Sequence, residues 1–120
     1  MRAILIDPFT RTVSNIDTDA TLDDMYSVLQ VDLITVMQVG GGHAMILDDE
    51  GLLKDRDSQA YFTMRGLAQP LAGRAMILGD EYGENRAATL TIEEVEDKVV
   101  WLDNEKVKPE QWTGWTVTTW

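Results

Sequence analysis

The residues best suited to chemistry are two acidic turns, Asp48-Asp49-Glu50 and Asp80-Glu81. Clustered carboxylate oxygens are the ligands that magnesium and calcium prefer, and the two turns could share a cation if the segments that carry them lie side by side. Neither turn has the alternating ligand spacing of a calcium loop, and acidic residues around a glycine are also typical of solvated hairpin turns. We therefore expect solvated turns, with no metal and no cofactor, and a metal-dependent hydrolase ranks last among the functions considered.

Catalytic signatures are missing from the rest of the chain. The sequence has no Gly-x-Ser-x-Gly, no Gly-x-x-x-x-Gly-Lys-Ser/Thr phosphate loop and no His-Glu-x-x-His. The only histidine, His43, stands at the start of an expected strand, where an edge or core residue is commoner than a catalytic base. Gly40-Gly41-Gly42 joins two expected strands and does not open a helix, so it predicts a turn and not a phosphate cradle. We predict no catalytic residue and no enzyme.

Aromatic and arginine side chains form a second set with binding chemistry. Tyr61, Phe62 and Tyr82 could stack on a flat ligand, although two of the three are more simply core residues. The arginine fork suits phosphate, and the candidate arginines are Arg56, Arg65, Arg74 and Arg86. This set supports an alternative function, an oligomeric protein that binds or sequesters a nucleotide or another small molecule between protomers.

The acidic turns end two copies of one phrase. Residues 42–50 (GHAMILDDE) recur as residues 73–81 (GRAMILGDE), 31 positions later, and seven of the nine positions are identical. Each copy starts with a glycine, continues as an apolar run too short for an ordinary helix, and ends in carboxylates followed by Gly51 or Gly83. This pattern predicts two similar buried strands, each leading into an acidic turn.

The segments around the repeat predict one mixed, mostly antiparallel sheet with two or three short helices. Residues 3–7 and 12–16 are expected to form a hairpin, and residues 32–39 a strand that reverses at the glycine run into the first copy. Thr21 is a helix cap before apolar residues at helical spacing. Thr91, with Glu94 three positions later, matches the capping box of a last helix.

Several segments stay open or rest on weaker patterns. Residues 58–67 suit a strand or a helix, and we favour a short helix capped by Ser58. Residues 79–86 are expected to form a polar loop, and residues 98–102 either continue the last helix or form a strand. Residues 112–120 predict a final strand in which Trp115 and Trp120 face opposite sides. Trp120 then lies on the surface or in an interface with a second copy or a partner.

Composition favours one domain, residues 1–120, in a reducing compartment. The chain is 44% hydrophobic and has no cysteine, so a core must hold it without disulfides. Its 10 basic and 21 acidic residues give a net charge of -11, which disfavours direct binding of nucleic acids or anionic membranes. Excess acid of this kind is explained by solubility of a small protein, or, in the alternative, by attraction to a basic partner. The first residues lack a signal-peptide core, and no apolar stretch reaches the roughly 20 residues that span a membrane, so we expect a cytoplasmic protein.

Three motifs carry a resemblance: residues 2–8 (RAILIDP), 49–54 (DEGLLK) and 71–80 (LAGRAMILGD). Together they resemble an uncharacterised family of small domains encoded by bacteriophages and plasmids, over most of residues 1–105. The chain departs from that family at Ser58-Gln59-Ala60, where an asparagine-containing stretch is usual, and residues 111–120 lie outside the resemblance. The resemblance implies an accessory protein of a mobile element in a bacterial cytoplasm, and it carries over no catalytic residue.

The sequence thus predicts a small α+β domain that acts by binding. The favoured function is that of a non-catalytic, phage-type accessory protein, which binds and modulates a host protein with a basic surface through its own acidic surface. A nucleic-acid enzyme or a defence component would be such a host protein. A homodimer is a further expectation, because it would cover an outward tryptophan. The candidate partner-binding residues are Asp48, Asp49, Glu50, Asp80, Glu81, Trp115 and Trp120.

Overall fold

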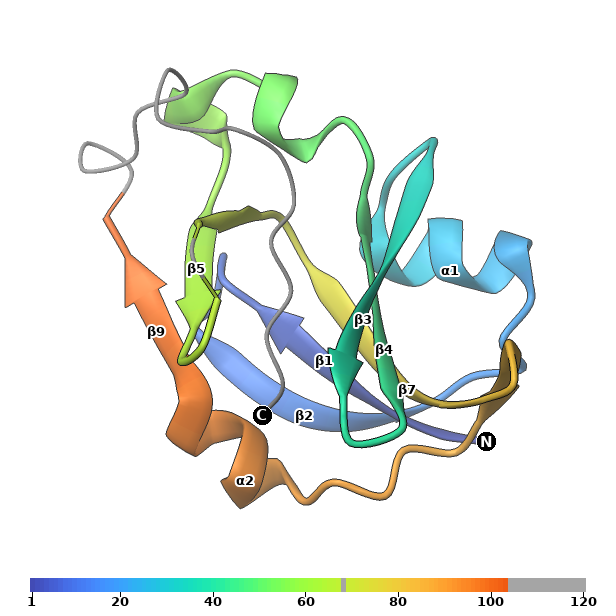
Figure 1. The fold of residues 1–120 in the computed structure, drawn as a ribbon. Coiled ribbons are helices and arrows are strands. Elements are labelled where there is room, and N and C mark those ends of the chain that lie inside the picture. Colours follow the sequence, from blue (N-terminus) through green and yellow to red (C-terminus); the bar gives the residue numbers. More distant parts are fainter. Residues whose placement is uncertain (68, 104–120) are drawn as a thin grey trace.

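Two antiparallel sheets organise the protein in a computed structural model that describes residues 1–67 and 69–103 (Figure 1). The larger sheet has the order β2-β1-β7-β4-β3, with β8 paired to the end of β7, and the smaller sheet has the order β6-β5-β9. Every strand pair in this part of the chain is antiparallel. The elements are β1 (Arg2–Asp7), β2 (Thr12–Asp17), α1 (Leu22–Leu29), β3 (Ile34–Gly40), β4 (His43–Asp48), η1 (Gly51–Leu53), η2 (Arg56–Ser58), β5 (Tyr61–Met64), β6 (Leu71–Ala72), β7 (Ala75–Glu81), β8 (Glu84–Arg86), α2 (Ile92–Lys98) and β9 (Val99–Leu102).

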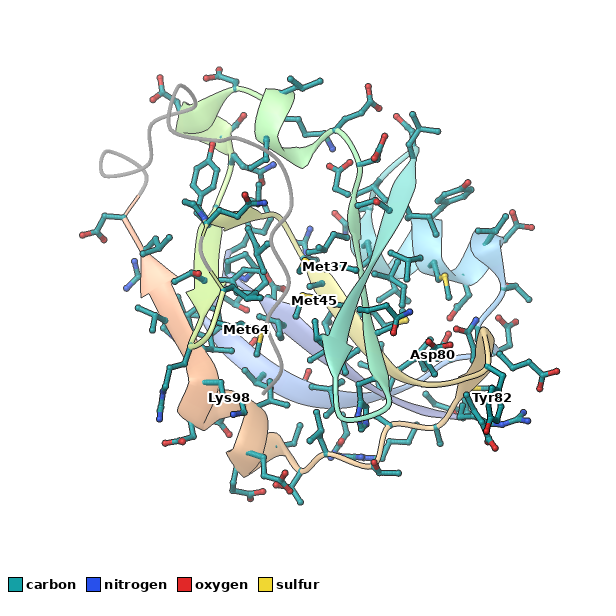
Figure 2. The ribbon with its side chains drawn as sticks, in the orientation of Figure 1. Met37, Met45, Met64, Asp80, Tyr82 and Lys98 are labelled. Atoms are coloured by element: carbon teal, nitrogen blue, oxygen red, sulfur yellow. The ribbon has the colours of Figure 1, made fainter. Side chains whose placement is uncertain are left out.

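The core lies on both faces of the larger sheet. Because side chains alternate along a strand, β4 sends Met45 toward the smaller sheet and Ile46 toward α1. Met37 and Met64 belong to the same inner cluster as Met45 (Figure 2). On the other face, α1 buries Met25 and Leu29. Burial on both faces explains why the repeated strands are apolar at consecutive positions.

The predicted hairpins and helix caps are confirmed. The chain enters β4 from β3 through the glycine turn, and β1 pairs with β2 across the turn that contains Pro8. The hydroxyl of Thr21 accepts the backbone N–H of Asp24 at the start of α1, and Thr91 and Glu94 form the capping box of α2. These capping residues therefore predict correctly where each of the two α-helices begins.

The favoured helix over residues 58–67 is wrong. Ser58 ends η2, and Tyr61–Met64 is the strand β5, which pairs with β6 and with β9. For residues 98–102, whose sequence suits a helix or a strand, α2 ends at Lys98 and the chain continues as β9. The aromatic and β-branched residues of β5 and β9 suit a pleated, half-buried surface better than a helix. The protein therefore has two sheets, whereas the sequence predicts a single one.

The polar loop expected over residues 79–86 is also wrong. Strand β7 continues to Glu81 and returns as β8, with Tyr82 and Gly83 at the turn. Both turn residues have positive φ, +52° and +84°. Two-residue hairpin turns of this kind require that conformation, and glycine adopts it without strain.

The predicted α+β class is confirmed by this antiparallel arrangement with its two described α-helices. The strand predicted over residues 112–120 lies outside the described residues. In the described part of the chain, the α-helices are only seven and eight residues long, and none has the length and apolar character to cross a membrane.

Candidate functional site

The two copies of the repeated phrase lie side by side, as β4 and β7, and run in opposite directions. Ala44 pairs with Leu78, and Ile46 pairs with Met76. The condition for a shared metal site, neighbouring strands, is therefore met. The antiparallel direction nevertheless puts Asp48-Asp49-Glu50 at one end of the strand pair and Asp80-Glu81 at the other. Within residues 1–67 and 69–103, no group of three histidine or carboxylate side chains is placed to hold a metal ion.

Antiparallel pairing joins the start of each copy to the end of the other. Continuing the register past Ile46 and Met76 brings Arg74 level with Asp48, and both residues line one pocket. At the opposite end His43 pairs with Gly79, and the backbone N–H of Asp80 donates to the carbonyl oxygen of Gly42 over 2.8 Å. One end of the strand pair therefore combines Asp48 with Arg74, and the other combines His43 with Asp80.

The first acidic turn is largely internal. The side chain of Asp48 is 2% exposed, and its Oδ2 lies 2.5 Å from Nζ of Lys54. Its Oδ1 accepts the backbone N–H of Glu50 at 2.9 Å. Glu50 is half-buried, and Asp49 is exposed and donates its backbone N–H to the carbonyl oxygen of Leu33 at 3.1 Å. Of the three acidic residues predicted to meet a partner here, Asp49 alone is fully on the surface.

A pocket of about 310 Å³ opens beside this turn. Arg74 crosses it: Nε lies 3.2 Å from Oδ2 of Asp7, and the guanidinium carbon lies 4.6 Å from the centre of the Phe9 ring. Gln59, which is buried, donates from its amide nitrogen to the carbonyl oxygen of Gly51 at 2.9 Å. The pocket, which we call the Arg74 pocket, is lined by Phe9, Leu29, Gln30, Val31, Asp48, Lys54, Ser58, Gln59, Gly73 and Arg74.

At the other end, His43 is buried and fully engaged. Its Nε2 accepts the backbone N–H of Thr89 at 3.1 Å, and its Nδ1 lies 2.9 Å from the carbonyl oxygen of Gly41. Since a backbone amide can only donate, Nε2 carries no proton and Nδ1–H donates to Gly41. Both ring nitrogens thereby tie the glycine turn to the segment that leads into α2.

A groove of about 430 Å³ is lined by residues of α1, of β3 and β4, and of the β7–β8 hairpin. Leu22 on α1 and Val36 on β3 are each 57% exposed there. Strand β3 is an edge of the larger sheet, and its sequence ITVMQVG has no charged residue. This groove, which we call the outer groove, is lined by Ala20, Leu22, Met25, Ile34, Val36, Gln38, Ala44, Ile46, Asp80, Gly83 and Asn85.

The second acidic turn forms one rim of the outer groove. Asp80 is half-buried and lines it, next to Tyr82, which is 100% exposed at the tip of the hairpin (Figure 2). Glu81 is exposed and pairs with Nε of Arg86 at 3.2 Å. That hydrogen bond from Arg86 to Glu81, followed by the charge of the nearby Glu84, raises the pKa of Arg86. The hairpin thus presents a fixed set of charges beside an apolar floor.

The start of α1 adds more negative charge beside the outer groove. Asp19 precedes the helix, and Asp23 lies in its first turn. The hydroxyl of Thr21, and after it the backbone N–H of Thr21, donate to Asp19 and lower the pKa of its carboxyl. Asp19 is therefore a carboxylate at neutral pH.

The remaining candidate residues that the structure describes do not converge. Tyr61 and Phe62 are buried in the core. Arg65 pairs with Asp97, Arg86 pairs with Glu81 and Glu84, and Arg56 belongs to η2. Trp115 and Trp120 lie outside the described residues. Among Arg65, Arg74 and Arg86, the candidate arginines whose side chains the structure describes, Arg74 is the one that lines a described pocket.

Sequence reasoning missed Lys54 and Phe9 as companions of Arg74, and Leu22 and Val36 as the exposed floor of the outer groove. The pocket residues come from segments far apart in the chain, and no local pattern links them. The sequence of β3 did contain a signal for the groove. Val36 and Met37 are consecutive and face opposite sides of the strand, so both faces of this edge strand are apolar.

Comparison with known proteins gives one match. No curated protein and no solved structure matches the chain. A family described as a domain of unknown function, DUF3846, matches residues 1–104, which include all of the elements described above. The resemblance to an uncharacterised family of small domains is thereby confirmed, and the chain belongs to the DUF3846 family.

Proposed function

We propose that this protein is a non-catalytic accessory protein of a phage or plasmid, which acts in the cytoplasm of a bacterial host by binding a host protein with a basic surface. The observation that carries the proposal is the outer groove, an apolar floor beside an uncharged edge strand, with carboxylates along its rim. A nucleic-acid enzyme or a defence component with a basic surface is the kind of host protein that this groove suits.

The apolar floor supports a protein partner. Edge strands of soluble proteins are commonly protected by charged residues or proline, because an open edge invites pairing with another chain. Strand β3 has neither, and Val36 is 57% exposed beside the equally exposed Leu22. A partner segment that lies along β3 would bury both side chains and extend the sheet.

The rim supports the basic character of that partner. Asp80 lines the groove, and Asp19 and Asp23 lie at the start of α1. Glu81 and Glu84 continue along the same hairpin as Asp80, where both pair with the single cation of Arg86, so the hairpin keeps an excess of negative charge. The described lining contains no lysine or arginine. Complementary rim charges steer a partner and select against acidic ones, so an apolar segment flanked by lysine or arginine fits best. Binding through such a surface would occupy the basic face that a host enzyme presents to nucleic acid.

The test compares capture from a bacterial lysate by the wild-type protein and by three charge variants. Val36→Lys and Asp80→Lys place a cation in the outer groove. Glu93→Lys reverses a charge, as Asp80→Lys does, but on α2, which does not line the groove. We expect one basic protein to be retained at low salt and released at high salt. Its capture should fall at least tenfold with both groove variants and change less than twofold with Glu93→Lys.

Two results would contradict the proposal. Equal loss with Glu93→Lys would mean that net charge alone governs capture. A molar mass in solution of two chains, reduced to one by Val36→Lys, would mean that a second copy of this protein occupies the outer groove.

A further inference from the structure

The Arg74 pocket holds two cationic side chains and one carboxylate in a chain of net charge -11. The carboxylate, Asp48, is already satisfied, because Lys54 pairs with one oxygen and the backbone N–H of Glu50 with the other. With its side chain 2% exposed, Asp48 acts mainly on Lys54 and offers little to a ligand. The groups available to a ligand are therefore the donors of Lys54 and Arg74.

Arg74 and Lys54 each have N–H groups that are not used in the hydrogen bonds and ion pairs described. Arg74 donates from Nε to Asp7 and from Nη1 to the side-chain oxygen of Gln30 at a long 3.5 Å. Its Nη2 makes no hydrogen bond to any residue in the described part of the chain. The ammonium of Lys54 carries three N–H donors, and its ion pair with Asp48 uses one. The side-chain amide of Gln30, at the same pocket, adds two further N–H donors.

Three donor groups on separate side chains favour phosphate over carboxylate. A carboxylate has two oxygens in one plane, whereas a phosphate monoester has three terminal oxygens in a tetrahedral arrangement. Arginine binds such an anion with two parallel N–H groups, and lysine binds it as a point charge. Asp7 and Phe9 hold the guanidinium of Arg74 from two sides, so little side-chain freedom is lost when an anion binds.

The rest of the pocket suits a small carbon skeleton. Leu29 and Val31 give the pocket an apolar wall, and the ring of Phe9, which contacts Arg74, also lines it. The volume of about 310 Å³ is at the lower limit of small-molecule sites, which range from about 300 to 1,000 Å³. We propose that the Arg74 pocket binds a small phosphate monoester no larger than a mononucleotide, with its phosphate on Arg74 and Lys54 and its apolar part against Leu29 and Val31.

The experiment is a titration of the full-length protein followed by amide chemical shifts. The probes are adenosine 5′-monophosphate, phenyl phosphate, inorganic phosphate and adenosine. We expect both monoesters to shift the amides of Gln30, Val31 and Gly73, and at least one of them to bind at least tenfold more tightly than inorganic phosphate and than adenosine. The hairpin that borders the outer groove should not respond, which separates this site from the proposed protein-binding surface.

Two variants remove the anion contact in different ways. Arg74→Gln removes the guanidinium, and it also breaks the ion pair with Asp7, so the variant can fail to fold. Gln30→Glu keeps size and shape at an exposed position and places a carboxylate against Arg74. Each variant should weaken binding of the monoesters at least tenfold. Arg86→Gln, the matched control outside the pocket, should change it less than twofold.

Three outcomes would overturn the proposal: no amide shift with any probe at millimolar concentration, adenosine binding as tightly as its monophosphate, or unchanged binding in the folded Gln30→Glu variant. Equal affinity for inorganic phosphate and for both monoesters would also overturn it, because the apolar wall would then contribute nothing.

Discussion

His43 and Thr89 are joined by a hydrogen bond in which a backbone N–H donates to an imidazole nitrogen, Nε2, over 3.1 Å. This bond crosses 46 positions of the chain and ties the start of β4 to the segment before α2. The amide of Thr89 cannot accept a hydrogen bond, so Nε2 must be the unprotonated nitrogen of the ring. The ring proton is then on Nδ1, which donates to the carbonyl oxygen of Gly41 at 2.9 Å.

The first prediction concerns that tautomer. Long-range ¹H–¹⁵N spectra of the histidine ring at neutral pH should show Nδ1 protonated and Nε2 unprotonated. His43→Ala should lower the free energy of unfolding by about 1–3 kcal/mol in urea titrations, since the partly buried backbone N–H of Thr89 loses its acceptor and a buried ring is removed. A ring protonated on Nε2, or a variant as stable as the wild type, would show that His43 does not hold this segment.

The second prediction concerns the ion pair between the buried carboxylate of Asp48 and the half-exposed side chain of Lys54. Lys54→Met leaves a carboxylate that is 2% exposed without its cation, and we expect the free energy of unfolding to fall by about 1–3 kcal/mol. The matched control is Arg65→Met, which breaks an exposed pair with Asp97 and should cost less than about 1 kcal/mol. Equal costs in chemical denaturation would contradict the internal role given to Asp48.

The third prediction concerns Gly79, where β7 passes close to the segment after β8. A Cβ at this position would lie 2.7 Å from the carbonyl oxygen of Ala87, so Gly79→Ala must displace backbone. We expect a loss of about 1–3 kcal/mol and shifted amide resonances along the β7–β8 hairpin.

The control for Gly79 is Gly83→Asn at the hairpin turn. Its φ is +84°, nothing lies within 4 Å of the added Cβ, and asparagine tolerates this conformation better than most residues. It should cost about 1 kcal/mol or less. If Gly83→Asn proves the more damaging change, close approach at Gly79 is not what shapes the hairpin.

The fourth prediction concerns the pKa of Asp19. The hydroxyl of Thr21 is the largest cause of the lowered pKa, so Thr21→Val should raise it toward its ordinary value. Because the folded pKa lies below the unfolded one, ionised Asp19 stabilises the fold at neutral pH, and that contribution is lost as the pH falls through the folded pKa. Carboxyl ¹³C titrations measure the shift. Thr91→Val, the equivalent change at the cap of α2, should leave Asp19 unaffected, and a shift there of the same size would contradict the local cause.

Local patterns predict most of this fold. The caps at Thr21 and Thr91 and the turn at Gly40-Gly41-Gly42 depend on hydrogen bonds and backbone conformations within a few residues, so the sequence reveals them. The same reasoning fails at Tyr61–Met64, because a strand of four residues is too short to show the alternation of apolar and polar residues that identifies a strand. Its pairing with β9, nearly 40 positions later, decides its structure.

The candidate sites were less predictable, because each depends on direction as well as on proximity. The repeat predicts that β4 and β7 are similar buried strands, but nothing in either copy predicts that the two strands run antiparallel. That direction moves Asp48 away from Asp80 and brings it level with Arg74. Neither the Arg74 pocket nor the outer groove is confined to one segment of sequence, so both required the tertiary structure.

The central claim is that a basic partner lies along β3 in the outer groove, and site-specific photo-crosslinking in bacterial cells tests it most directly. A photoreactive side chain would replace Val36 on β3 or, as the control, the exposed Ser14 on β2, the opposite edge strand of the larger sheet. We predict a crosslink to one basic bacterial protein from position 36 and none from position 14. Equal crosslinking from both positions, none from position 36, or a crosslink to a second copy of this chain would contradict the account.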